Sequence, residues 1–443
     1  MTRSQGGGSG ISTELIDVRK PVDRAVLVGA PDRDLPKRLA DEHLEELARL
    51  TDTAGCSVVG TVVQRIAHRH PRFYIGEGKA QEVAELARET QADLVIFDEE
   101  LTPAQGKGLE ELLGVRVMDR SELILDIFAT RARSKEAKMQ VELAQLEYLL
   151  PRLKRMWTHL SRIRGGIGLR GPGETQLETD KRLIGKRISE LKRKLDDVSK
   201  SRAVQRHGRG ERFRASLVGY TNAGKSSLLR ALSGADLFVE DRLFATLDSA
   251  TRTVPLGNGH DALVTDTVGF IRKLPHDLVA SFRSTLEEAR EADVLLHVID
   301  ASHTDSEEQV EVVNGVLEDL GLAEQDTILV FNKIDRLTHA EEQTLRERIR
   351  ALESTPAVFV SAHDDRSLDA LRDTLRARVQ ARLAHVVVHV PSTDGEAIAA
   401  LYRGGEVVAR ADEDSTVSLT AWVPQTLLGR IAGRSGVTVE DLA

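Results

Sequence analysis

The sequence predicts a multidomain α/β protein, and three observations support that fold class. Short runs of aliphatic and β-branched residues alternate with helical stretches at two places in the chain, which favours mainly parallel sheets. A heptad repeat lies between these two regions, and a glycine-rich loop opens the second of them. The 443 residues correspond to about three domains at roughly 150 residues each.

Composition narrows the class further. Cys56 is the only cysteine, so no internal disulfide can form and nothing requires an oxidising compartment. The apolar runs, such as residues 386–388, are far shorter than the roughly 18 residues that a membrane span needs. Residues 1–20 lack the apolar centre of a signal peptide and are expected to form a flexible tail. We expect a cytoplasmic, monomeric protein without a membrane span.

The first alternating region predicts an N-terminal α/β domain over residues 21–130, and residues 386–443 predict a small α+β domain. The glycine-rich run at 76–79 lacks a full phosphate-loop pattern, so it is either a structural turn or part of a second nucleotide site. The predicted elements are strands at 25–29, 57–64 and 94–97 and helices at 35–50 and 79–89 in the first domain, and strands at 386–390, 406–409 and 416–421 in the last.

Residues 131–212 carry the heptad repeat. Apolar residues spaced alternately by four and three form a seam that predicts two helices, and a short connection between them predicts an antiparallel helical hairpin. Pro151 lies inside the seam and should kink or end the first half. The seam residues are Met139, Leu143, Leu146, Leu150, Leu153, Trp157 and Leu160, followed by Leu177, Ile184, Ile188, Leu191, Leu195 and Val198.

Charge is concentrated in the same region. The chain has a net charge of −9, yet residues 152–214 contain 19 Lys or Arg against 7 Asp or Glu. A basic segment in an acidic protein predicts a local contact with a polyanion, and a solvated helical face is the alternative. The predicted tip loop, residues 164–182, contains five closely spaced glycines, which permit close approach to another surface or merely reverse the chain.

The second alternating region, residues 213–385, begins with a strand at 214–218, a loop and a helix from 227. The loop matches G-x-x-x-x-G-K-[ST] in its required strand–loop–helix context, which predicts a phosphate-binding loop. Lys225 is expected to contact the β- and γ-phosphates and Ser226 Oγ to ligate Mg²⁺. The predicted phosphate-binding residues are Gly219, Tyr220, Thr221, Asn222, Ala223, Gly224, Lys225 and Ser226.

A second strand, residues 262–265, ends in an acid that is expected to hold Mg²⁺ through its water shell, and the N–H of Gly269 is expected to meet the γ-phosphate. The polar loop before it supplies a second hydroxyl ligand, for which Thr246, Thr251 and Thr253 are candidates. The further candidates for nucleotide contact are Phe244, Ala245, Thr246, Leu247 and Asp248 in the loop and Asp266, Thr267, Val268 and Gly269 after the strand.

Two more strands, residues 327–331 and 357–360, end in polar segments. Asp335 can accept from N1–H and the exocyclic amine, a donor pair that guanine has and adenine lacks. Asn332 can bond the other edge of the purine, and the stem of Lys333 can lie along the ring. Four motifs in this order at strand ends predict a guanine-nucleotide site. The predicted base contacts are Asn332, Lys333, Ile334, Asp335, Ser361, Ala362 and His363.

Residues 213–385 resemble a translation-factor-type GTPase domain, and the segments at 74–79, 165–180 and 244–248 resemble the HflX family. The resemblance implies Mg²⁺-dependent GTP hydrolysis to GDP with Lys225, Thr246 and Gly269 in catalysis, and it selects Thr246 as the second Mg²⁺ ligand beside Ser226. It also implies binding to the large ribosomal subunit, with the helical arm directed towards the peptidyl-transferase region, and some members of the family split stalled ribosomes, notably after heat stress. The loop residues that would contact ribosomal RNA are Arg164, Gly165, Gly166, Gly168, Arg170, Gly171 and Gly173.

Phe270 stands where many Ras-like GTPases place a glutamine that orients the attacking water. Phenylalanine cannot make that hydrogen bond, so we expect slow unassisted hydrolysis and a partner that supplies the missing group. The alternative function is an RNA-binding or scaffold protein in which GTP is structural. Among ribosomal roles, splitting, rescue and assembly stay open.

Overall fold

The computed structural model describes residues 22–153, 172–207, 212–235, 242–257, 259–274, 288–352, 355–413 and 415–442. The chain divides into two compact units, one up to Asp119 and the other from Arg120 onward. The finer division into domains expected from the sequence stays a prediction. Among the described helices, none is both long and apolar enough to cross a membrane.

The first unit is a four-stranded parallel sheet with the order β2-β1-β3-β4. The central strands β1 and β3 are apolar and buried almost throughout, as parallel strands covered on both faces must be. The elements are β1 (Arg24–Gly29), α1 (Lys37–Thr53), β2 (Ser57–Val63), α2 (Glu77–Glu89), β3 (Leu94–Phe97), α3 (Pro103–Leu113) and β4 (Arg116–Asp119). The strands and helices predicted for this region are confirmed, with ends that differ by at most three residues.

Helix α3 and strand β4 are not among the predicted elements. Gly106 and Gly108 lower the helix propensity of α3, which hides it from a pattern search. A capping box between Thr102 and Gln105 nevertheless starts the helix, and Gly114 ends it at φ +71°. The local caps therefore outweigh the weak propensity of the interior.

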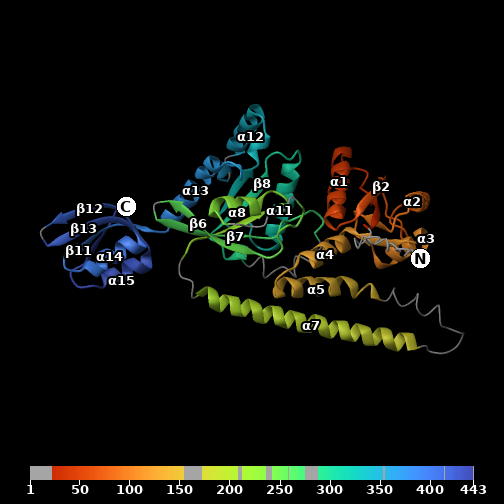
Figure 1. Cartoon of the computed structure of the whole chain (residues 1–443), viewed down its shortest axis with the longest axis horizontal. Helices are drawn as coiled ribbons and strands as arrows, with labels where there is room; N and C mark the ends of the chain where they lie inside the picture. The colour runs from red at the N-terminus through yellow and green to blue at the C-terminus, as the bar shows by residue number, and fades with distance from the viewer. Residues whose placement is uncertain are drawn as a thin grey trace, which may run out of the picture. The chain divides into compact units, whose positions relative to one another are not determined.

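The second unit contains a six-stranded sheet with the order β10-β9-β8-β5-β7-β6, in which only β6 runs antiparallel to its neighbour (Figure 1). Helices α8 and α13 pack on β6 and β7, whereas α11 packs on β8 and β5. The elements are β5 (Arg214–Gly219), α8 (Lys225–Ser233), β6 (Ala250–Gly257), β7 (His260–Asp266), β8 (Val294–Asp300), α11 (Ser306–Asp319), β9 (Thr327–Asn332), η1 (Ile334–Arg336), α12 (His339–Leu352), β10 (Ala357–Phe359) and α13 (Asp365–Gln380). This is the predicted doubly wound, mainly parallel fold.

Parallel pairing brings the carboxyl ends of the central strands together. Gly219 at the end of β5 lies opposite Val298 of β8, and Asp300 at the end of β8 lies opposite Asn332 of β9. Asp266 ends β7 on the other side of β5. Polar segments that are far apart in the sequence thus meet at one edge of the sheet, where ligands bind in open α/β sheets.

Within the described part of the chain before this sheet, the second unit has the helices α4 (Arg120–Arg131), α5 (Lys135–Leu149) and α7 (Pro172–His207). Helices α5 and α7 lie side by side (Figure 1) and are joined by ion pairs from Arg187 to Glu142 at 2.7 Å and from Lys192 to Glu147 at 2.8 Å. The predicted seam on α7 is confirmed within the described side chains, because Ile184, Ile188, Leu191, Leu195 and Val198 are all buried or half-buried.

The prediction of a loop up to residue 182 is wrong in its second half. Helix α7 begins at Pro172, a residue suited to the first position of a helix because its missing N–H would have no partner there. Gly173 is therefore helical, whereas Arg164, Gly165, Gly166, Gly168, Arg170 and Gly171 lie outside the described residues.

The chain ends in a four-stranded antiparallel sheet with the order β12-β13-β11-β14. Alternate residues of β11 and β13 are buried, and α14 and α15 share the core of that sheet. The elements are β11 (Ala384–Pro391), α14 (Gly395–Gly404), β12 (Glu406–Glu413), β13 (Thr416–Val423), α15 (Gln425–Ala432) and β14 (Thr438–Asp441). The predicted α+β character and the three predicted strands are confirmed.

The burial of Leu191 predicts that α7 depends on its seam. Leu191 is fully buried on the helix that packs along α5, so Leu191→Ala should lower the free energy of opening α7 by about 2–4 kcal/mol through the cavity it leaves. Native-state hydrogen exchange of α7 amides measures this opening. Leu183, which is 56% exposed on the same helix, supplies the control: Leu183→Ala should change the opening by less than about 0.5 kcal/mol. Equal effects of the two substitutions would contradict the seam.

Candidate functional site

The loop between β5 and α8 has a backbone that only glycine permits at its two ends. Gly219 has φ +147° and Gly224 has φ +95°. A Cβ on Gly219 would lie 2.3 Å from the carbonyl oxygen of Val298, and one on Gly224 would lie 2.3 Å from Nδ2 of Asn332. The loop is thus packed against the ends of β8 and β9, and it leads directly into the N-terminus of α8, where backbone N–H groups suit an anion.

Lys225, the first residue of α8, is buried within the turn that it follows. Its Nζ donates to the carbonyl oxygens of Gly219 at 3.1 Å and Tyr220 at 2.9 Å. Burial lowers the pKa of Lys225 to about 8. The two carbonyls hold the ammonium beneath the loop, facing the space that phosphates would fill.

Three oxygen-bearing side chains converge beside this ammonium. Ser226 Oγ lies 2.6 Å from Thr246 Oγ1 and donates to Asp266 Oδ2 at 2.6 Å. The second carboxylate oxygen, Asp266 Oδ1, is buried without a hydrogen-bond partner among the described residues. Burial also raises the pKa of Asp266. Two hydroxyls and a carboxylate with an unsatisfied oxygen fit a hard divalent cation such as Mg²⁺, which prefers oxygen ligands and retains some of its water.

Gly269 brings the segment after β7 against the phosphate loop. A Cβ on Gly269 would lie 2.7 Å from Thr221 Cα and 2.9 Å from Lys225 Nζ, so this residue packs closely against the loop. It also lines a cavity that Lys225 and Ser226 share, which we call the nucleotide cavity. Phe270 follows, and its backbone bonds to Gly219 and Thr221 while its ring is fully buried. A buried phenyl ring offers no hydrogen-bond donor or acceptor to a water at the site. Of the other predicted residues here, Thr267 lines the cavity and Val268 is buried.

Asn332 fastens the phosphate loop to the segment after β10. Its Nδ2 donates to the carbonyl oxygen of Ala223 at 2.9 Å, and its Oδ1 accepts from the N–H of Ala362 at 3.2 Å. Lys333 makes a second link, because its Nζ donates to the carbonyl oxygen of Asn222 at 2.8 Å. These two residues hold together the segments predicted to bind phosphates and base, and a direct bond from Asn332 to a purine stays a prediction.

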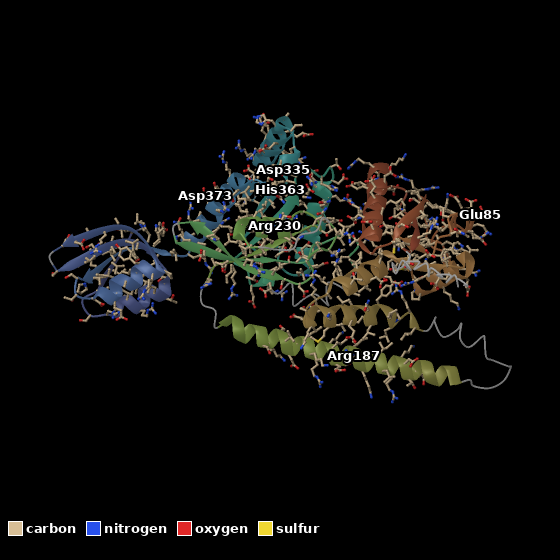
Figure 2. All side chains as sticks on the ribbon, viewed as in Figure 1. Glu85, Arg187, Arg230, Asp335, His363 and Asp373 are labelled. Carbon is tan, nitrogen blue, oxygen red and sulfur yellow. The ribbon has the colours of Figure 1, made fainter. Side chains whose placement is uncertain are left out.

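Asp335 lies next to the last of the predicted base-binding segments. Its Oδ1 accepts from Ser361 Oγ at 2.5 Å, and the same hydroxyl accepts from the N–H of His363 at 3.1 Å. Figure 2 shows Asp335 and His363 close together beside the sheet. The other carboxylate oxygen of Asp335 has no hydrogen bond to the rest of the described chain, so the residue retains acceptor capacity for a ligand.

The loop with Thr246 divides into residues that line the cavity and residues that do not. Phe244, Ala245 and Thr246 line it, whereas Leu247 is buried elsewhere and the carboxylate of Asp248 bonds to Ser134 at the start of α5. Contact of Leu247 and Asp248 with nucleotide stays a prediction. Thr251 and Thr253 lie on β6, and Thr251 bonds to Thr265, which leaves Thr246 as the hydroxyl beside Ser226.

Sequence reasoning missed two residues that line this cavity. Ser227 follows the phosphate-loop motif directly, and Arg242 precedes the polar loop by two residues. The positive charge of Arg242, so near in sequence to the loop predicted to contact phosphates, could have identified it as a candidate. The full lining is Thr221, Asn222, Gly224, Lys225, Ser226, Ser227, Arg242, Phe244, Ala245, Thr246, Thr267 and Gly269.

Comparison with known families covers most of the chain. Residues 41–129 match the family model described as "GTP-binding GTPase N-terminal", residues 131–209 match "GTP-binding GTPase Middle Region", and residues 214–333 match "50S ribosome-binding GTPase". The boundaries of these matches follow the order of the elements described above.

Curated relatives extend the similarity to nearly full length. GTPase HflX of Magnetococcus marinus is 43% identical over 433 residues, which cover 96% of this chain and 99% of that protein. GTPase HflX of Escherichia coli K12 is 43% identical over 412 residues, which cover 91% and 94%. A crystal structure of a GTP-binding protein from Sulfolobus solfataricus in complex with GDP is 26% identical, covers 80% of this chain and 98% of that one, and has a TM-score of 0.43. On the identity and coverage of the curated relatives, the chain belongs to the HflX family of GTPases and hydrolyses GTP.

Proposed function

We propose that this GTPase binds the large ribosomal subunit and uses GTP to split or rescue stalled ribosomes or to assist their assembly. The match of residues 214–333 to a 50S ribosome-binding GTPase family is the observation that carries this proposal. The basic segment supports it, because exposed Lys and Arg side chains lie along α7, where they can contact RNA phosphates. A ribosomal partner would place the activity in the cytoplasm.

The geometry of the site supports specific roles in hydrolysis. Lys225 would neutralise the β- and γ-phosphates from beneath, and Gly269 would let a backbone N–H approach the γ-phosphate. Ser226 and Thr246 would ligate Mg²⁺ directly, and Asp266 would hold its water shell through Oδ1. When bound, Mg²⁺ supplies positive charge to the phosphate oxygens. Asp335 would select guanine with its carboxylate.

The burial of Phe270 bears on the rate. Phenylalanine at this position cannot orient the attacking water, so intrinsic turnover should be slow. A ribosomal partner would reshape the site or supply the missing group. The decisive experiment compares GTP turnover with and without purified large subunits, alongside sedimentation of the complex. Stimulated turnover and GTP-dependent binding are expected. Unchanged turnover and nucleotide-independent binding would favour instead an RNA-binding scaffold in which nucleotide is structural.

Base selection at Asp335 predicts a change of nucleotide preference. Asp335→Asn replaces an acceptor-only group with one that also donates, which suits the 2-oxo group of xanthine and opposes the amine of guanine. We expect a loss of GTP affinity of about a hundredfold and improved binding of XTP, since hydrogen bonds to a charged group are each worth about 1.5–3 kcal/mol. Competition binding measures both. Asp364→Asn, a change at a neighbouring carboxylate that caps α13, is the control, and a variant of Asp335 that still prefers GTP would refute the assignment.

The phosphate site predicts that substitutions of Lys225 and Ser226 impair hydrolysis in two distinguishable ways. Lys225→Ala should weaken GTP binding and lower turnover by about a hundredfold or more, because a buried charge that faces the phosphates is lost. Ser226→Ala should instead raise the Mg²⁺ concentration needed for half-maximal turnover. Turnover measured across a Mg²⁺ titration separates the two. Ser227→Ala, which removes a neighbouring hydroxyl from the cavity lining, should leave the Mg²⁺ requirement unchanged. Hydrolysis that survived complete chelation would count against the metal roles.

The basic face of α7 predicts a salt-dependent interaction with RNA. Replacing Lys181, Arg182, Lys186 and Arg193 by glutamine should weaken binding to large subunits and reduce the slope of log affinity against log salt by about one for each phosphate that is no longer neutralised. Affinity of the isolated protein for GTP should not change. The matched control replaces Lys37, Arg366, Arg403 and Arg430, which are exposed outside this region. If the two variants lost equal affinity for large subunits, α7 would contribute only through the total charge of the protein and not through a specific contact with RNA.

A further inference from the structure

The segment that carries Thr246 is attached at both ends to helices that precede the nucleotide-binding sheet. We call residues 244–248 the Thr246 loop. Thr246 stands in its centre, two residues from Phe244 and two from Asp248. Each of these flanking side chains makes a specific contact with α4 or with the start of α5.

Phe244 forms the first attachment. Its backbone has φ +55°, a left-handed conformation that a bulky residue adopts only under constraint. The ring is buried and meets the ring of Phe128 on α4 edge to face, with centroids 4.7 Å apart and planes at 86°. The N–H of Phe244 donates to Thr221 Oγ1 at 2.9 Å. This residue therefore joins the phosphate loop to α4.

Asp248 forms the second attachment. Its Oδ2 accepts from the N–H groups of Arg133 at 3.1 Å and Ser134 at 3.2 Å, and its Oδ1 accepts from Ser134 Oγ. Ser134 is also the N-cap of α5, where its Oγ accepts from the N–H of Ala137 at 3.0 Å. The carboxylate thus lies at the positive end of the α5 helix, which favours a negative charge there.

Between these attachments lies Thr246, the predicted second ligand of Mg²⁺. Its Oγ1 lies 2.6 Å from Ser226 Oγ, in the group of oxygens that fits a divalent cation. A five-residue loop held at its first and last residues leaves its central residue little freedom, which lowers the entropy lost when that residue engages a ligand.

We propose that Phe244 and Asp248 are positioning residues for GTP hydrolysis and that the α4–α5 helices are the support against which the Thr246 loop closes. Because binding linkage is reciprocal, a ligand that holds Thr246 in place also stabilises the start of α5, and a partner that displaces α5 releases Thr246. This coupling goes beyond the proposed ribosomal function and does not depend on it, since it acts within the isolated chain.

The kinetic test separates positioning from nucleotide affinity. Asp248→Ala should lower kcat for GTP by about tenfold or more, since it removes charge-assisted hydrogen bonds that hold the loop, while GDP affinity stays within about twofold. Asp248→Asn, which keeps an acceptor oxygen, should recover part of the loss. Asp261→Ala, at an exposed carboxylate on β7, is the control and should leave kcat unchanged.

A double-mutant cycle tests whether Asp248 acts through Ser134. The Ser134→Ala/Asp248→Ala variant should be no slower than Asp248→Ala alone, because both substitutions break the same hydrogen bond. Additive losses in kcat would overturn the proposal, and so would wild-type kcat in Asp248→Ala.

Hydrogen exchange at the start of α5 distinguishes coupling from unfolding, because unfolding would lower the protection of the whole helix with either nucleotide. In the wild-type protein, a non-hydrolysable GTP analogue should protect the amides of residues 134–138 more than GDP does, and Asp248→Ala should abolish that difference while leaving the rest of α5 intact. Equal protection by the two nucleotides in the wild-type protein would show that α5 does not sense the Thr246 loop and would overturn the coupling.

Discussion

The close approach of the loop after β5 to the ends of the neighbouring strands is the constraint on which the whole site depends. Gly219 and Gly224 have no room for a Cβ, because a carbonyl of β8 and the Asn332 amide lie where that atom would be. The loop packed in this way folds around Lys225, whose Nζ donates to the carbonyl oxygens of Gly219 and Tyr220. The segments after β7, β8 and β9 are placed next to that loop by the register of their strands, since parallel strands deliver their carboxyl ends to the same edge.

The attachments of the Thr246 loop extend this arrangement to the preceding helices. The position of the Thr246 loop is fixed by the edge-to-face packing of Phe244 on Phe128 and by the bond of Asp248 to Ser134, the N-cap of α5. The ion pairs between α5 and α7 connect the helix that binds Asp248 to the helix that carries much of the basic segment. Since Phe270 cannot orient water, the proposed coupling assigns the position of Thr246 a larger part in controlling hydrolysis.

Local sequence patterns predict the parts of the site that lie close to strand ends and miss those that depend on distant partners. The phosphate loop, Asp266 and the segment from Asn332 to Asp335 each show their chemistry within a few residues of a strand end, so their meeting follows from parallel pairing alone. The motif around Asp248 points to nucleotide, yet its partner Ser134 lies 114 residues away and no spacing rule connects them. The helical start at Pro172 is hidden by the glycines around it, which resemble a loop in composition.

Burial gives Lys225 and Asp266 opposite shifts from one cause. It lowers the pKa of the lysine and raises that of the aspartate, because both charged forms lose solvation in the same enclosed site. Each partly compensates the other, but Asp266 Oδ1 still lacks a partner among the described residues. A nucleotide that brings phosphate oxygens to the ammonium, with a divalent cation near the carboxylate, would replace the missing solvation at both ends at once. Part of the binding free energy should therefore come from relieving a desolvation cost that the folded chain already carries at Lys225 and Asp266.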